Sequence, residues 1–363
     1  AVINFIQQGE GFRLFLHVES KNQFASGLIG LYCFGFHFEA KTTMFIHSMK
    51  AIQLFSPAKI NLFLSVLGPR GDGFHELLSL ACPLDFGDQI SLEIHAMPGT
   101  DLLKCDLPGL PLDGSNLILQ AVCLFRSQHP FPGRVIIDLR KMIPMGAGLG
   151  GGSSNAAAVL WGLNVLLGKP LGREVLSQLA AALGSDCPLF LEGGAVILRG
   201  RGEQVLPVNE SSLGRLMGRE VLLLLPDLHV STSWAYGRFQ GLRDGYANQS
   251  VAESRLSSFH DDEISLESFL FNSFEPVVFE KFTVLQAAKV QLQDADCGPV
   301  LLSGSGSSMF MLLPKCGLDG SIEEKLFKDL EDSFGPDLRL VKARLAPFFP
   351  EPFKLQACSN DTF

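Results

Sequence analysis

The residues most suited to chemistry are five glycines within seven positions, at 146, 148, 150, 151 and 152, followed by Ser153 and Ser154. Glycine bends a backbone freely and lets it approach a ligand closely. A serine is a good helix cap, and the free N–H groups of a helix N-terminus attract anions. The pattern therefore predicts a phosphate-binding loop at the start of a helix.

Other glycine loops fit this stretch less well. A Walker loop requires Lys-Ser or Lys-Thr after its last glycine, where this chain has Ser153 and Ser154. Gly146, Gly148 and Gly151 match the dinucleotide pattern, but no acidic residue follows them before position 174 to hold a ribose. The H-R-D and D-F-G set of protein kinases does not occur downstream of the loop. A glycine-rich turn that binds nothing is the remaining alternative.

Two charged residues stand in unusual surroundings. Lys59 interrupts an apolar run, and a lysine beside a transferring phosphoryl group stabilises developing charge. Asp186 lies on a forced turn between Gly184 and Pro188, a rigid position suited to a catalytic base. The alternatives are an edge lysine whose amine reaches solvent and an aspartate that caps local N–H groups.

An aromatic residue and a histidine are adjacent at Phe74 and His75, after a glycine-rich turn. Such a pair can stack on a nucleobase and bond to its edge. Ordinary packing is the alternative.

Elements that position these residues follow from the periodicity of the apolar residues. Strands are expected at 52–67, 89–95, 134–140, 195–198, 221–225, 300–302 and 309–313. Helices are expected at 117–125, entered through Ser115 and Asn116, and at 156–167, 173–183, 285–292 and 322–334. A polar stretch at 208–218 suggests a boundary, residues 241–264 an exposed connection, and 346–363 an irregular tail.

Composition limits the class of protein. The chain has 363 residues, of which 47% are apolar and 18% charged, so two domains with sizeable cores are expected. A net charge of -9 argues against nucleic acid as a partner, and no apolar run approaches the ~20 residues that span a bilayer. Eight cysteines without a C-x-x-C pair favour reduced thiols in a cytoplasmic enzyme.

The first 48 residues show no clear period. A well-patterned strand begins directly after Met49, so we expect the native protein to start near Met44 or Met49. Deletion of residues 1–48 should then leave the activity intact.

The loop resembles the signature P-x-x-x-G-L-G-x-x-S-S-x-A-A of the GHMP small-molecule kinases, which phosphorylate galactose, homoserine, mevalonate and phosphomevalonate. The resemblance implies that ATP binds the loop, with Mg²⁺ near Ser153 or Ser154, of which Ser154 is taken as the metal residue. The implied ATP-binding residues of the loop are Pro144, Met145, Gly146, Ala147, Gly148, Leu149, Gly150, Gly151, Gly152, Ser153 and Ser154. Asn116 and Lys141 align with contacts on the adenine side.

Further stretches at 56–64, 72–77, 184–188 and 303–308 are similar to one member of that family, over about residues 50–345. This implies phosphorylation of the 2-hydroxyl of a cytidine-diphosphate-linked methylerythritol in the non-mevalonate isoprenoid precursor pathway. Asp186 would accept the hydroxyl proton, Lys59 would steady the charge, and Asn61 would place the erythritol part.

The same resemblance implies the residues that hold the base. His75 would bond to cytosine between Phe74 and Tyr236, and Gly304 and Gly306 would contribute to the substrate site. The family usually has a tyrosine where this chain has Phe74, so stacking is retained and a contact from a ring hydroxyl is lost.

The implied fold is α+β, the two-domain GHMP-kinase fold, with an N-terminal domain like the second domain of ribosomal protein S5 and a ferredoxin-like C-terminal domain. The expected limits are an extension at 1–48, domains at 49–212 and 213–345, and a tail at 346–363. A monomer or weak homodimer with a small-molecule substrate is expected, without nucleic-acid or membrane partners. The alternatives are another kinase of this fold, of the mevalonate or homoserine type, or a non-catalytic module.

Overall fold

The computed structural model describes residues 50–239, 241, 245–261, 263–295, 297–347 and 353 with their side chains, and some further segments as strands alone. The chain divides into two units. Unit 1 comprises 1–50, 94–100 and 132–134, and unit 2 comprises the remainder. The expected start near Met44 or Met49 lies outside the fully described residues.

Unit 1 contains a sheet with the strand order β1-β6-β2-β3 and a separate β4–β5 pair. The strands are β1 Val2–Phe5, β2 Leu14–Ser20, β3 Gln23–Leu28, β4 Leu31–Cys33, β5 Phe36–Phe38 and β6 Ala40–Phe45.

A large sheet is formed around two long strands, β7 Lys50–Pro69 and β8 His75–His95. Its order is β12-β11-β8-β10-β9, and β7 pairs with β8, β14 and β18. Residues 52–67, expected as a strand with two apolar runs, are one continuous strand, largely buried. The other strands are β9 Leu102–Cys105, β10 Arg134–Arg140, β11 Val196–Arg199, β12 Gln204–Pro207, β14 Phe271–Asn272 and β18 Lys354–Gln356.

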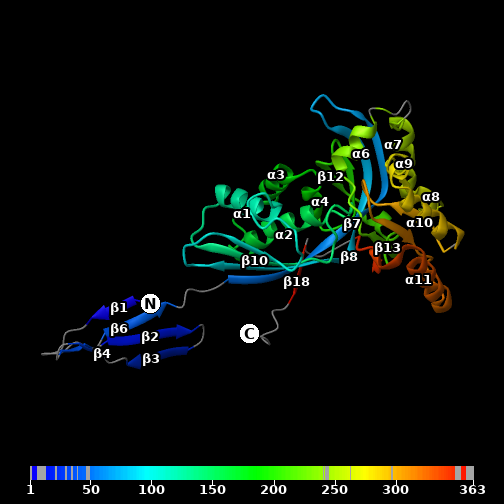
Figure 1. Cartoon of the computed structure of the whole chain (residues 1–363). Coiled ribbons are helices and arrows are strands. Elements are labelled where there is room, and N and C mark those ends of the chain that lie inside the picture. The colour runs from blue at the N-terminus through cyan, green and yellow to red at the C-terminus, as the bar shows by residue number, and fades with distance from the viewer. Residues whose placement is uncertain are drawn as a thin grey trace. The chain divides into compact units, whose positions relative to one another are not determined.

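Helices α1, α2 and α3 gather on one side of this sheet (Figure 1). In α1 (Leu117–Gln128), Asn116 is the N-cap as predicted, because its Oδ1 accepts the Ile118 N–H at 3.0 Å. Helix α2 (Gly151–Leu166) is apolar on nearly all faces and almost entirely buried, as expected for a core helix. The other two helices of this layer are α3 Arg173–Leu183 and α4 Cys187–Leu191.

A second sheet has the order β15-β16-β13-β17 and is antiparallel throughout. Strand β13 (Glu220–Pro226) is a continuous apolar run because both of its faces are buried. Leu222 and Leu224 pack with helices of the second half, whereas Val221 and Leu223 pack into a core shared with β7 and β8. The remaining strands are β15 Val300–Leu302, β16 Met309–Leu312 and β17 Leu338–Arg344.

The helices of the second half include the two that were predicted, at 285–292 and 322–334, together with helices that were not predicted. They are α5 Glu210–Leu213, α6 Thr232–Phe239, α7 Gln249–Ser257, α8 Leu266–Phe269, α9 Glu275–Lys281, α10 Thr283–Asp294 and α11 Gly320–Phe334, with 3₁₀ turns at Ser258–His260 and Gly335–Asp337. The α+β class is therefore confirmed. None of the helices within the described residues is long and apolar enough to cross a membrane.

Two expectations about irregular segments were wrong. Within 241–264, helix α7 forms and buries Ala252 and Leu256 on one face. In the tail, Phe353 is buried against Trp161 with ring centroids 5.9 Å apart, and β18 pairs antiparallel with β7 at Leu54 and its neighbours. The end of the chain thus completes the sheet that carries Lys59.

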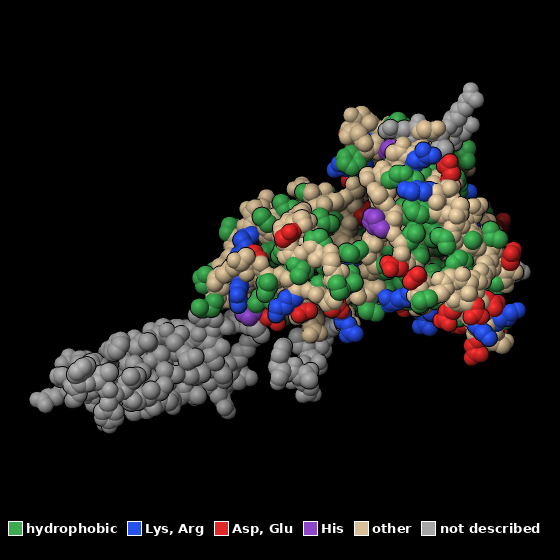
Figure 2. Space-filling model, viewed as in Figure 1, with side chains coloured by type: hydrophobic (Ala, Val, Ile, Leu, Met, Phe, Trp, Pro, Cys, Tyr) green, Lys and Arg blue, Asp and Glu red, His purple; other side chains and the backbone are tan. Residues whose placement is uncertain are grey.

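Surface charge agrees with the composition. On the face shown in Figure 2, acidic and basic side chains alternate over the surface, and no basic stripe gathers there.

Candidate active site

A cavity of about 910 Å³ lies within unit 2 and is lined by residues of the large sheet, of the glycine-rich loop and of the second half of the chain. Nearly all of the predicted site residues border it. These are Lys59, Asn61, Phe74, His75, Asn116, Lys141, Pro144 to Ser153, Asp186, Tyr236 and Gly304. Ser154 and Gly306 are absent from its lining.

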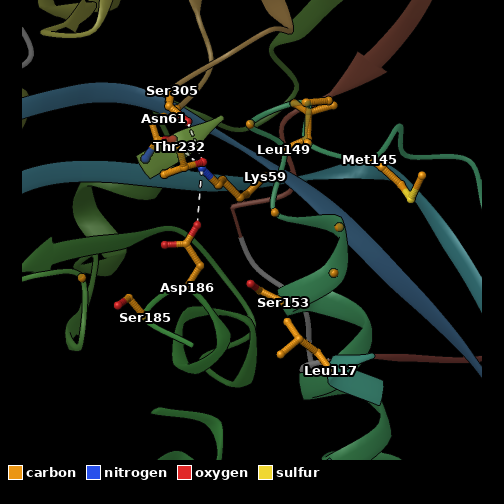
Figure 3. A pocket seen from close by; sticks show the side chains of 18 of the residues that line it. Lys59, Asn61, Leu117, Met145, Leu149, Ser153, Ser185, Asp186, Thr232 and Ser305 are labelled. Carbon is orange, nitrogen blue, oxygen red and sulfur yellow. Dashed lines mark hydrogen bonds and ion pairs between the residues drawn. The ribbon is translucent and has the colours of Figure 1, made fainter. Parts of the chain in front are cut away.

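Lys59 and Asp186 meet inside this cavity (Figure 3). Lys59 Nζ lies 3.8 Å from Asp186 Oδ2 and donates to Asn61 Oδ1 at 2.6 Å. Asn61 donates in turn to Ser79 Oγ at 2.9 Å, and Ser79 donates to the Phe63 carbonyl at 2.6 Å. This series of bonds fixes the ammonium group on β7.

Burial lowers the pKa of Lys59, and the negative charge of Asp186 partly offsets that effect. The lysine is almost fully buried, while the Asp186 side chain is 42% exposed. The ammonium is therefore a fixed internal charge, and the carboxylate faces the cavity where a ligand can reach it.

Asp186 does not act as a helix cap. It occupies the N-cap position of the short helix α4, but its side chain accepts no capping hydrogen bond. The alternative that Asp186 caps local N–H groups at the start of α4 therefore has no support in the geometry.

The loop enters α2 through glycine rather than serine. Gly150 is the N-cap, with a left-handed φ of 73° and no side-chain cap, so the expected serine cap at the helix start is wrong. A Cβ at Gly150 would lie 2.9 Å from Phe190 Cζ and 3.1 Å from Lys59 Cγ. Glycine here permits both the turn and the close approach of Lys59.

A second glycine-rich segment, 303–308, interlocks with the loop at Gly148. Gly148 has φ +76°, and a Cβ there would lie 2.1 Å from the Ser303 carbonyl oxygen. Ser308 N–H donates to the Ala147 carbonyl at 3.1 Å, and Ser303 Oγ donates to the Gly148 carbonyl at 3.2 Å. Segment 303–308 therefore packs against the loop and holds the backbone at Ala147 and Gly148 in place.

The two serines of the loop have different roles. Ser154 is fully buried, and its hydroxyl bonds to Ser56 Oγ at 2.7 Å, while Ser56 donates to Asn155 Oδ1 at 2.8 Å. Ser153 borders the cavity. The assignment of Ser154 to the metal stays a prediction, although Ser153 is the loop serine that borders the cavity.

Asn116 and Lys141 border the cavity, but their polar groups already bond to other groups of the protein. Asn116 caps α1 and donates to the Pro111 carbonyl at 2.7 Å. Lys141 pairs with the fully buried Asp88, which also accepts the Met142 and Ile143 N–H groups at 2.7 and 2.9 Å. Asp88 thus joins β8 to the segment that leads into the loop.

Aromatic side chains form another part of the cavity wall. His75 stacks on Tyr236 with ring centroids 5.0 Å apart, and its Nε2 lies 3.3 Å from the Tyr246 hydroxyl. Burial lowers the pKa of His75 and, with the charge of Asp186 adding to it, raises the pKa of Tyr236. Phe74 is 48% exposed, with the Arg201 guanidinium 4.7 Å above its ring.

Sequence reasoning missed three residues of this region. Arg201 lines the cavity, and its place between Gly200 and Gly202 is a signal that could have singled it out. Asp88 and Tyr246 had no such signal, because each acts on a residue far away in the sequence.

Comparisons with known proteins agree with this geometry. Residues 116–194 match the family model described as the GHMP kinases N terminal domain. A 4-diphosphocytidyl-2-C-methyl-D-erythritol kinase of Protochlamydia amoebophila is 39% identical over 267 residues, which cover 74% of this chain and 86% of that protein. The chain belongs to this kinase family, within the GHMP kinases.

Solved structures of this family and its neighbours share the fold. A crystal structure of 4-(cytidine 5'-diphospho)-2C-methyl-D-erythritol kinase aligns with a TM-score of 0.62 at 30% identity, over 81% of this chain and 99% of that one. A homoserine kinase from Cytophaga hutchinsonii aligns with a TM-score of 0.60 at 19% identity, over 86% of this chain and 100% of that one, which shows the fold alone. The predicted GHMP-kinase fold is confirmed, while the domain limits at 48, 212 and 345 stay a prediction.

Proposed function

We propose that the protein transfers the γ-phosphoryl group of ATP to the 2-hydroxyl of 4-(cytidine 5'-diphospho)-2-C-methyl-D-erythritol, a step of the non-mevalonate isoprenoid precursor pathway. One observation carries this proposal. The pair Lys59–Asp186 lies in a single cavity that has a glycine-rich loop and an aromatic wall containing His75 and Tyr236. A kinase for a nucleotide-linked alcohol needs all three parts.

ATP is expected to lie along the loop. Backbone N–H groups of the loop and the start of α2 suit the triphosphate, because a helix N-terminus favours negative charge. Leu110, Pro111, Leu117 and Met145 offer apolar surface for the adenine at the same side of the cavity. Asn116 and Lys141 then act by shaping this side, since their polar groups are bonded within the protein.

The transfer breaks the bond between the γ-phosphorus and the bridging oxygen of ATP and forms a bond to the substrate oxygen. Asp186 orients the hydroxyl and receives its proton, and ADP leaves with the bridging oxygen. Lys59 stabilises the charge that develops on the transferred group. Asn61 holds Lys59 in place through their 2.6 Å bond.

The site fits Mg²⁺ bound mainly through phosphates. Among the described residues there is no cluster of three acidic, histidine or cysteine side chains that could hold a metal alone. Ser153 and Asp186 border the cavity with oxygen atoms, the donors that Mg²⁺ prefers alongside phosphate and water. When bound there, the ion neutralises phosphate charge.

The cytidine end is assigned to the aromatic wall. His75 bonds to the base, and Tyr236 and Phe74 supply aromatic surface for it. Arg201, above Phe74, adds positive charge near the substrate's diphosphate. A monomer or weak homodimer in the cytoplasm remains a prediction.

The main alternative is a kinase of the same fold for mevalonate or homoserine. Those alcohols have no base to stack, so the aromatic wall favours the cytidine substrate. A non-catalytic module is disfavoured because Lys59 and Asp186 face each other in an open cavity.

The test measures ADP release from ATP with the cytidine substrate, mevalonate and homoserine in parallel. We expect turnover with the cytidine substrate alone. Turnover with mevalonate or homoserine at an equal kcat/KM would overturn the assignment. Asp186→Ala is the matched control for contaminating ATPase activity.

A further inference from the structure

The two ring nitrogens of His75 have different surroundings. Nε2 lies 3.3 Å from the Tyr246 hydroxyl, while Nδ1 makes no hydrogen bond with any other described residue. His75 borders the cavity and Tyr246 does not. Nδ1 is therefore the nitrogen left for a ligand.

Tyr246 is held firmly in position. Its ring stacks on Phe239 with centroids 5.8 Å apart and an interplanar angle of 21°. The next residue, Ala247, donates its N–H to the Val66 carbonyl on β7 at 2.9 Å. The ring stack and the backbone bond of the next residue thus hold the hydroxyl beside His75.

The hydrogen-bond inventory of the pair sets the direction of the bond. Within the part of the chain that the structure describes, the Tyr246 hydroxyl has no other acceptor, so donation to Nε2 satisfies its proton. Burial lowers the pKa of His75, which keeps the ring neutral with one N–H. When Nε2 accepts from Tyr246, that N–H is on Nδ1.

We propose that Tyr246 is a positioning residue that holds His75 in the Nδ1–H tautomer and thereby selects cytosine over uracil. The proposal rests on the cytidine substrate of the proposed function. N3 of cytosine is an acceptor, which an Nδ1–H donor matches, whereas N3 of uracil carries a hydrogen and opposes it. Recognition of a base along this edge needs such a fixed donor.

Tyr246→Phe tests this tautomer role because it removes the hydroxyl and keeps the ring that stacks on Phe239. Without the hydroxyl, His75 can adopt either tautomer, and Nδ1 can accept from uracil. One hydrogen bond contributes roughly tenfold in an equilibrium constant, so the preference for CDP over UDP should fall by about that factor.

The measurement is calorimetric binding of CDP and of UDP, with the ATP site saturated by a non-hydrolysable ATP analogue. We expect the wild-type protein to prefer CDP, and Tyr246→Phe to lose about tenfold of that preference with an unchanged melting temperature. If Tyr246→Phe keeps the wild-type ratio of CDP affinity to UDP affinity, the proposal is overturned. Equal weakening of CDP and UDP also overturns it, because that result indicates packing alone.

A double-mutant cycle tests whether Tyr246 acts on the base through His75. His75→Ala should abolish the preference, and adding Tyr246→Phe to it should change nothing further. An additional loss in the double variant contradicts action through His75. Failure of the proposed function is distinct, because it would show as no turnover of the cytidine substrate by the wild-type protein, whatever the CDP to UDP ratio.

Discussion

The contact between Gly148 and segment 303–308 yields a quantitative prediction for Gly148→Ala. The methyl group would lie 2.1 Å from the Ser303 carbonyl oxygen and 3.0 Å from that of Gly306, at a φ of +76°. A left-handed alanine costs about 1–2 kcal/mol. The clash is with backbone, which must move away and stretch the bonds of Ser308 to Ala147 and of Ser303 to Gly148.

Each of those two bonds contributes about 0.5–1.5 kcal/mol. We therefore expect Gly148→Ala to lower the free energy of unfolding by about 2–5 kcal/mol, measured by urea denaturation. Because the loop is displaced from the triphosphate, kcat/KM for ATP should fall by about 100-fold, as a misplacement of 1 Å can cause.

Two further glycines serve as comparisons for Gly148→Ala. In Gly304→Ala the new Cβ would lie 3.0 Å from the Gly148 carbonyl oxygen, a milder clash at the same contact. The loss in the free energy of unfolding should therefore be smaller. Gly172 has an ordinary φ of -72° and no atom near its Cβ position, so Gly172→Ala should cost only about 1 kcal/mol, because glycine is better than alanine at the N-cap of α3, and should leave the ATP kinetics unchanged. Wild-type stability and wild-type ATP kinetics in Gly148→Ala would refute the tight contact between Gly148 and segment 303–308.

Three other predictions concern charged and titrating groups. Asp186→Asn should lower kcat by about 100–1,000-fold while calorimetry still shows binding of an ATP analogue, and a near-normal kcat contradicts its role. Asp88→Asn leaves the Lys141 ammonium without its buried partner and should lower the free energy of unfolding by about 3–5 kcal/mol in urea denaturation. Adding Lys141→Met should restore part of that loss. An unchanged free energy of unfolding in Asp88→Asn contradicts the pairing. His75 has a pKa below its ordinary 6.5, so below about pH 6.5 the unfolded chain binds more protons than the folded one. The free energy of unfolding should fall as the pH drops through this range and the folded pKa, and this slope should flatten in His75→Gln.

Residues that act within a local motif could be predicted from the sequence. The glycine loop, Lys59, Asp186 and His75 each stand in a short run whose composition is unusual for ordinary packing. The structure brings all of them to one cavity. Their types and immediate neighbours made them candidates beside structural alternatives, and the resemblance to the GHMP kinases gave each of them an expected role.

Residues that act across the fold could not be predicted in this way. Asp88 meets Lys141 across 53 positions and Tyr246 meets His75 across 171, so neither has a local pattern. The serine cap was predicted wrongly because Gly150 adopts a left-handed conformation that lets the helix begin at Gly151. Helix α7 was missed because few of its residues, among them Ala252, are buried, which leaves a weak period.

The pairing of β18 with β7 has a consequence for synthesis on the ribosome. About 300 residues separate the two strands, so at roughly 5–20 residues per second the partner of Leu54 emerges on the order of 15–60 s later. During that interval this part of β7 lacks one of its neighbours, and an unpaired strand is a site of aggregation. The strand that carries Lys59 is therefore among the first elements of the large sheet to be made and among the last to be completed.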